Sequence, residues 1–172
     1  MASYEELFSI GERFDAFVGH GLPTEIAAVQ TVQRKLANPG VISDETVQRL
    51  QAIQGRYHLL VAGEMWCPDC QINVTVMDYL QRVQPNVELA VITKGRAEDD
   101  LLSRLEIDRV PIPLVAVLDA EFRLVGRFVE KPQDVIAGGE AMKPDYRAGR
   151  YLDSTLRDLL AIFEAAEGRE AN

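Results

Sequence analysis

The two cysteines of the chain, Cys67 and Cys70, are the residues whose type and spacing indicate chemistry most directly. They lie three positions apart in the run Trp66-Cys67-Pro68-Asp69-Cys70, after an apolar segment that is typical of a buried strand. In a helix, residues i and i+3 bring their Cβ atoms to about 5–6 Å, whereas a disulfide needs about 3.5–4.5 Å. A small adjustment therefore closes or opens the bond, and the pair is suited to a reversible dithiol–disulfide switch.

A helix that begins at this motif gives the two sulfurs different roles. Cys67 would lie at the helix N-terminus, where unpaired N–H groups and the helix dipole favour a thiolate. We therefore expect the pKa of Cys67 to lie below the ordinary thiol value of about 8.5. Cys70 lies one turn further into the helix, so we expect it to be more buried and to stay protonated. The hypothesis is that Cys67 attacks a partner disulfide and that Cys70 resolves the mixed disulfide.

Two other interpretations of the cysteine pair stay open. A zinc site needs two further ligands, and His20 and His58 are the only histidines of the chain. An extended chain would place His58 more than about 20 Å from Cys67, and His20 alone does not complete four ligands without a carboxylate. The other open interpretation is that the pair consists of two core cysteines by coincidence. The order of strand, aromatic residue, CxxC and helix favours redox chemistry, and we expect no metal.

The elements around the cysteines follow from apolar patterning. Strands are expected at 57–62, 87–92, 114–118 and 122–129, the last two forming a hairpin with a turn at 119–121. Helices are expected after the cysteines up to Pro85, at 97–105 and at 151–166. The order β-α-β-α-β-β-α predicts an α/β fold with a mixed four-stranded sheet flanked by helices. The Gly- and Pro-rich stretch at 132–149 is predicted to be a loop.

The first third of the chain is predicted to be helical. Apolar residues at near-helical spacing run from Tyr4 to Phe17, and Gly19 and Gly21 end that segment. Further helices are expected from Pro23 to about Asn38 and from a Ser43 N-cap to about Gly55. We accordingly divide the chain into a helical N-terminal extension, residues 1–55, that packs on the core, and a domain at residues 56–172.

The residues around the cysteines resemble the thioredoxin superfamily, and more narrowly a bacterial thioredoxin-like group with a helical N-terminal extension. The resemblance covers the chain from Tyr57 to the C-terminal helix, and Val110-Pro111-Ile112-Pro113 supports it as a second landmark. It implies a thioredoxin-like fold in which a cis-proline faces the CxxC and the residue before that proline pairs with the substrate backbone. A proline inside a paired strand loses a ladder hydrogen bond, which favours Pro113 as the cis residue and Pro111 as part of the preceding loop. The alternative is that Pro111 is the cis residue. A further interpretation is that the two prolines merely end a helix and begin an edge strand.

The chain departs from the thioredoxin pattern at two points. Thioredoxin has Gly-Pro between its cysteines, whereas this chain has Pro68-Asp69, and the charge of Asp69 should oppose the Cys67 thiolate. A buried acid in thioredoxin's preceding strand is matched here by Val61. Glu64 is therefore a candidate proton acceptor, or else a solvated loop carboxylate. Trp66 is expected beside the sulfur, where it contacts partners or simply caps the core.

The resemblance implies a thiol–disulfide oxidoreductase that reduces protein disulfides, with a reductase or small thiol as electron donor. The expected catalytic residues are Cys67, Cys70 and Glu64. The expected substrate contacts are Trp66, Pro68, Asp69, Pro111, Ile112 and Pro113. The alternative is a non-catalytic interaction module or passive redox sensor, which the apolar Val61 favours. We expect no organic cofactor, because no Gly-rich phosphate-binding loop follows a strand.

Composition narrows the classes of partner. The chain has 172 residues, with 18 Lys and Arg against 27 Asp and Glu, which gives a net charge of -9. An acidic chain without a Lys/Arg cluster argues against nucleic-acid and anionic-membrane partners. No apolar run approaches the roughly 20 residues that span a bilayer. Residues 1–6 lack the basic start and apolar stretch of a secretory signal, so a cytoplasmic location is expected.

Overall fold

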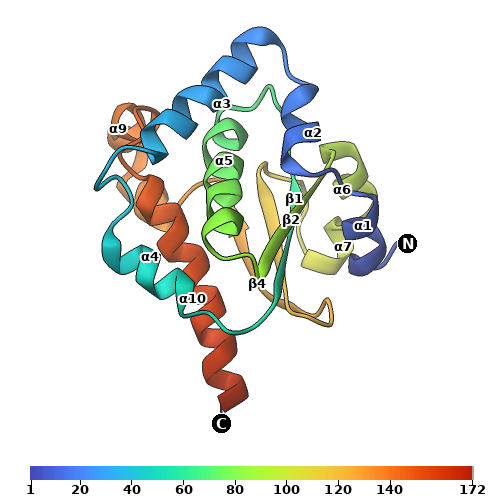
Figure 1. The fold of residues 1–172 in the computed structure, drawn as a ribbon. Helices are drawn as coiled ribbons and strands as arrows, with labels where there is room; N and C mark the ends of the chain where they lie inside the picture. Colours follow the sequence, from blue (N-terminus) through green and yellow to red (C-terminus); the bar gives the residue numbers. More distant parts are fainter. Residues whose placement is uncertain (172) are drawn as a thin grey trace.

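A four-stranded sheet in the order β2-β1-β3-β4 organises the computed structural model (Figure 1), which describes residues 1–171 and their side chains up to residue 168. β1 (Tyr57–Ala62) is parallel to β2 (Val87–Ile92) and antiparallel to β3 (Leu114–Leu118), which pairs antiparallel with β4 (Leu124–Val129). β1, β2 and β3 are almost entirely buried, which explains why their sequences are continuous apolar runs. The predicted mixed sheet and α/β fold class are confirmed.

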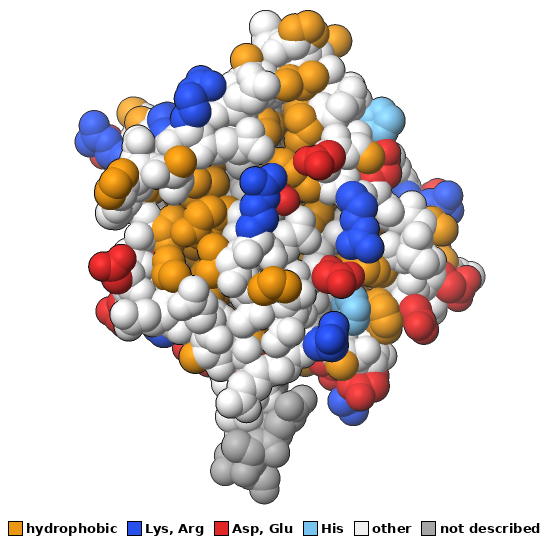
Figure 2. Space-filling model, viewed as in Figure 1, with side chains coloured by type: hydrophobic (Ala, Val, Ile, Leu, Met, Phe, Trp, Pro, Cys, Tyr) orange, Lys and Arg blue, Asp and Glu red, His pale blue; other side chains and the backbone are white. Residues whose placement is uncertain are grey.

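Helices cover both faces of this sheet. The structure has α1 (Tyr4–Ile10), α2 (Phe14–Gly19), α3 (Pro23–Leu36), α4 (Asp44–Gln51), α5 (Pro68–Val83), α6 (Lys94–Asp100), α7 (Leu102–Leu105), α8 (Gln133–Gly138), η1 (Gly139–Met142), α9 (Lys143–Arg147) and α10 (Leu152–Ala171). Figure 1 shows α3, α4, α5 and α10 on one side of the sheet and α1, α6 and α7 on the other. Hydrophobic side chains gather on the face that carries α3, α5 and α10 (Figure 2), where Leu36, Ala37 and Tyr79 line a cavity of about 190 Å³.

Two predicted helices are each divided in the structure. The segment from Tyr4 to Phe17 forms α1 and α2, because the chain between them is extended and Glu12 pairs with Val91 of β2 through two main-chain hydrogen bonds of 2.8 Å. β2 is an edge strand that pairs with β1 on one side only. Glu12 therefore binds main-chain groups of Val91 on the side that β1 does not reach. The predicted helix at 97–105 likewise consists of α6 and α7.

The prediction of a loop at 132–149 is wrong. α8, η1 and α9 occupy most of this stretch, and its Gly and Pro residues lie mainly at the ends of these short helices. Pro132 caps α8, Pro144 lies in the first turn of α9, and Gly139 ends α8 with φ +68°. Val135 and Tyr146 are buried, so packing against the core holds these helices in place.

The helices before β1 share one hydrophobic core with the sheet. Nine of the core side chains precede β1: Leu7, Phe14, Phe17, Val29, Val32, Leu36, Ile42, Leu50 and Ile53. No helix within the described residues combines the length and the apolar character that crossing a bilayer requires.

Candidate active site at the cysteine pair

The cysteine motif lies where β1 passes into α5. Cys67 is the N-cap of α5, and Pro68 occupies the first helical position, where its missing N–H costs no hydrogen bond. The connecting loop is fixed by two hydrogen bonds: the Cys67 N–H donates to the Glu64 carbonyl at 3.2 Å, and the Gln71 side chain donates to the Met65 carbonyl at 2.7 Å. Cys67 therefore lies at the N-terminal end of a 16-residue helix, as expected from the sequence.

The two thiols differ in burial and in acidity. Both are free; Cys67 is 6% exposed and Cys70 is fully buried. A hydrogen bond from the Cys70 thiol lowers the pKa of Cys67 to about 7, and the main-chain N–H groups of Cys70 and Asp69 act in the same direction against burial and the Asp69 charge. The hydrogen bond to Cys67, followed by burial, raises the pKa of Cys70 far above the ordinary thiol value. Cys67 is thus the sulfur with thiolate character near neutral pH.

A cis peptide bond joins Ile112 and Pro113, on the loop before β3. The preference for Pro113 over Pro111 as the cis residue is confirmed. The Cys67 thiol, when protonated, donates to the Ile112 carbonyl oxygen at 3.6 Å. The Pro113 carbonyl accepts from the Glu130 N–H at 2.8 Å, which ties this loop to the end of β4. The proline loop and the CxxC motif therefore meet at the Cys67 sulfur, although Ile112 and Cys67 are 45 positions apart in the sequence.

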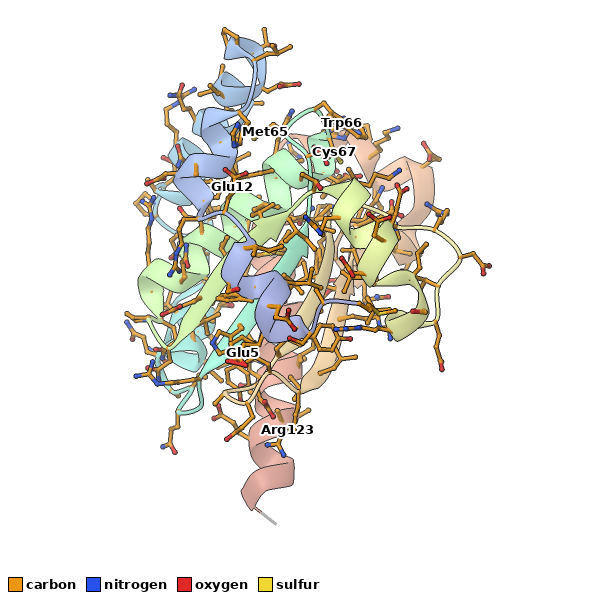
Figure 3. All side chains as sticks on the ribbon, turned by 90° about the vertical axis from the view of Figure 1, so that its right-hand side faces the viewer. Glu5, Glu12, Met65, Trp66, Cys67 and Arg123 are labelled. Atoms are coloured by element: carbon orange, nitrogen blue, oxygen red, sulfur yellow. The ribbon has the colours of Figure 1, made fainter. Side chains whose placement is uncertain are left out.

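Trp66 is 60% exposed, so it does not cap the core. Figure 3 shows it at the end of the molecule where Cys67 and Met65 also lie. Cys67 itself is nearly covered, whereas the adjacent apolar residues Trp66 and Pro68 are exposed. An exposed tryptophan at such a place is suited to contact with a partner.

Glu64 has another partner than the cysteines. Its carboxylate accepts a hydrogen bond of 2.8 Å from the Lys94 N–H, at the N-terminus of α6. Its main-chain N–H, by contrast, faces the Cys70 sulfur and favours the thiolate there. The fully buried Val61 supplies no acid. The carboxylate of Glu64 thus holds the loop to α6, and its role as a proton acceptor stays a prediction.

A buried polar network, which the sequence analysis missed, holds Asp69. The Tyr146 hydroxyl donates to the Asp69 carboxylate at 2.7 Å, and Lys131 lies 3.9 Å from the same carboxylate. The Asn73 amide donates to the Tyr146 hydroxyl at 2.8 Å and accepts from Thr155 at 2.7 Å. Burial raises the pKa of Tyr146, which keeps its hydroxyl protonated as a donor. The signal in the sequence was Asn73, a polar residue between Ile72 and Val74 in the apolar pattern of the helix.

The histidines of the zinc interpretation have other partners. His20 Nε2 lies 2.6 Å from the Glu12 carboxylate, and His58 Nδ1 lies 3.0 Å from the Asp119 carbonyl oxygen. Within the described part of the chain, no three His, Cys, Asp or Glu side chains group as metal ligands would. The structure therefore does not bring the histidines to the cysteine pair.

Comparison with known proteins gives a family and two close structures. The family model described as Thioredoxin matches residues 11–143, so the match begins within the predicted N-terminal extension. A protein of unknown function from Pseudomonas aeruginosa is 58% identical, with a TM-score of 0.93 over 96% of this chain and 99% of that one. An HIV epitope-scaffold is 56% identical, with a TM-score of 0.91 over 95% of this chain and 99% of that one. No curated protein matches the chain.

Proposed function

Because the chain belongs to the thioredoxin family, we propose that it is a thiol–disulfide oxidoreductase that reduces disulfide bonds in protein substrates. The observation that carries this proposal is the position of the Cys67 sulfur. It receives a hydrogen bond from Cys70, has its pKa lowered to about 7, and lies against the Ile112 carbonyl next to cis-Pro113. The Cys67 sulfur has thiolate character, and the neighbouring Cys70 thiol can displace a substrate that is bound to it.

The proposed reaction has two exchange steps. The Cys67 thiolate attacks one sulfur of the substrate disulfide, forms a mixed disulfide and releases the other sulfur as a thiolate that takes up a proton. Cys70 then loses its proton and attacks the Cys67 sulfur, which forms the Cys67–Cys70 disulfide and releases the second substrate thiol. Two electrons pass from the protein dithiol to the substrate. An external reductase or a small thiol returns two electrons and restores the dithiol.

The proposed substrate surface surrounds Cys67. Trp66 lies on one side, and the main chain of Ile112 before Pro113 is the expected partner for an extended substrate segment. Pro111, Pro68 and Asp69 complete the proposed contacts. Attack by Cys70 requires that its thiol give up a proton, and burial together with the hydrogen bond to Cys67 opposes this. Mixed-disulfide formation removes the negative charge from Cys67, so the pKa of Cys70 falls at the step where its thiolate is needed.

Reduction of insulin by dithiothreitol, followed by turbidity, tests the proposal. We expect the wild-type protein to accelerate precipitation and Cys67→Ser to abolish the acceleration. Cys70→Ser should retain the first step and accumulate a mixed disulfide on Cys67, detectable as an adduct by mass spectrometry. Equal rates for the wild-type protein and the Cys67→Ser/Cys70→Ser variant would contradict the enzymatic proposal.

The second candidate function is a passive redox sensor or interaction module. The buried Val61 favours it, because no acid there assists the deprotonation of Cys70. A sensor would form its internal disulfide with an oxidant but would not accelerate insulin reduction. The insulin assay therefore separates the two candidates.

A further inference from the structure

A cavity of about 530 Å³ lies directly beside the cysteine motif. Asp69, between the two cysteines, forms part of its wall, and Glu130 and Lys131 at the end of β4 form another part. Glu130 is also the residue whose N–H binds the Pro113 carbonyl. The rest of the wall comes from Val129 of β4 and from α8, η1 and α9. The cavity thus adjoins both halves of the proposed active site, and its size is typical of ligand-binding pockets.

The acids of this wall that lie nearest the cysteine motif have partners within the protein. Asp69 accepts the Tyr146 hydroxyl and lies 3.9 Å from Lys131, and its side chain is only 15% exposed. Glu130 lies 4.0 Å from Arg109. The nearby cations therefore partly cancel the negative charge of these two carboxylates in the cavity.

The cations that α9 contributes to the wall are less compensated. Lys143 and Arg147 are exposed residues of α9, and within the described residues neither has a carboxylate within 4.0 Å. Glu140 is the remaining acid of the wall. The apolar part of the wall includes Ile136, which is 47% exposed. The cavity accordingly offers two available cations beside an apolar surface, in a protein whose net charge is -9.

We propose that this cavity binds an acidic segment of the substrate polypeptide, next to the cysteine that Cys67 attacks. This inference rests on the proposed function, because the disulfide under attack brings the substrate chain to the cavity. An Asp or Glu side chain of the substrate pairs with Lys143 and Arg147, and an apolar side chain packs on Ile136. Asp69 of the cavity wall is two positions from Cys67, so residues near the substrate cysteine are the ones expected to enter the cavity.

Binding of matched peptides tests the proposal apart from turnover. The probes are two fluorescent disulfide peptides that differ only in having Glu or Gln at the positions flanking the cysteine, and the Cys67→Ser protein binds them without reaction. We expect the Glu peptide to bind about fivefold more tightly, as two partly exposed ion pairs allow, and the preference to shrink at about 0.5 M salt. The wild-type protein should show the same preference in kcat/KM.

Charge variants assign the preference to the cavity. Lys143→Gln/Arg147→Gln should remove it, and Lys143→Glu/Arg147→Glu should reverse it in favour of a peptide with Lys at those positions. Arg13→Gln/Arg34→Gln removes the same charge from residues outside the cavity and should leave the preference intact. Circular dichroism checks the folding of each variant, which the exposed positions of these side chains should not disturb.

Two failures are distinguishable. Equal binding of the Glu and Gln peptides, or a preference that survives in Lys143→Glu/Arg147→Glu, would overturn the inference about the cavity. Absence of reduction of either peptide by the wild-type protein would instead contradict the proposed function, whatever the peptides' affinities.

Discussion

Two sulfur atoms three residues apart hold their protons to very different degrees in this site. The largest part of the difference comes from one shared hydrogen bond: Cys70 donates it, so it stabilises the Cys67 thiolate and at the same time retains the Cys70 proton. The main-chain N–H groups at the start of α5 add to the effect on Cys67. The Asp69 charge acts against both thiolates. The reactivity of Cys67 is therefore a balance of opposing groups, and single substitutions should move it in either direction.

The pH dependence of alkylation tests this balance. The thiolate is the form that reacts, so the iodoacetamide rate at Cys67 should rise with pH around a midpoint near 7, compared with about 8.5 for an ordinary thiol. Cys70→Ala removes the donor to the thiolate, which destabilises the charged form, and should raise the midpoint. Rates are measured by mass spectrometry of the Cys67 peptide.

Asp69→Asn provides the opposite control. The asparagine oxygen still accepts the Tyr146 hydroxyl, but the negative charge is lost, so the midpoint for Cys67 should fall. A midpoint that stays near 8.5 in the wild-type protein, or moves the same way in both variants, would contradict the assignment of these groups.

At the scale of elements, sequence patterns succeed where burial is uniform. β1, β2 and β3 have the predicted bounds because each is an apolar run buried on both faces. β4 begins at Leu124 and not at Phe122, because Phe122 takes a left-handed conformation in the turn, with φ +62°. The helices between β4 and α10 were missed, since their Gly and Pro residues resemble loop signals when packing is unknown.

The same limit applies to the site. The sequence indicates Cys67, Cys70 and Pro113, because cysteine and proline have distinctive chemistry. The cysteines also have CxxC spacing, and the proline directly precedes a predicted strand. The sequence does not indicate Tyr146, because its contact with Asp69 joins residues 77 positions apart and depends on the unforeseen helix α9. Local patterns carry no information about such a contact.

Gly11 is a position where one element depends closely on another. A Cβ atom there would lie 2.8 Å from the Cβ of Ala90, so only glycine lets the chain between α1 and α2 approach β2. We expect Gly11→Ala to lower the free energy of unfolding by about 1–3 kcal/mol, through overpacking and weakened pairing of Glu12 with Val91. Urea denaturation measures the change.

Gly19→Ala is the matched control for Gly11. A Cβ atom at Gly19 meets nothing within 4 Å, and alanine is favoured over glycine in a helix such as α2. This substitution should leave the stability unchanged or raise it by up to about 1 kcal/mol. Equal stabilities of the two alanine variants would show that the approach of Gly11 to β2 carries no energetic weight.

At the scale of the whole molecule, the segment before β1 is part of what keeps the sheet buried. Its nine core side chains are distributed over α1 to α4 and the adjoining loops, and Glu12 covers the β2 edge. The family match also begins at residue 11, inside this segment. A fully buried aliphatic or aromatic side chain contributes about 1.5–3 kcal/mol, and a domain has only about 5–15 kcal/mol of net stability.

Removal of residues 1–55 should therefore leave residues 56–172 without a stable fold, although all four strands and the cysteine motif remain. The truncated chain exposes the surfaces of β2 and α5 that the segment covers, and loses a large share of the hydrophobic stabilisation. We expect it to show no cooperative thermal transition by near-ultraviolet circular dichroism and to aggregate at room temperature. A cooperative transition together with retained insulin reduction would show instead that the segment is a dispensable attachment and that residues 56–172 fold alone.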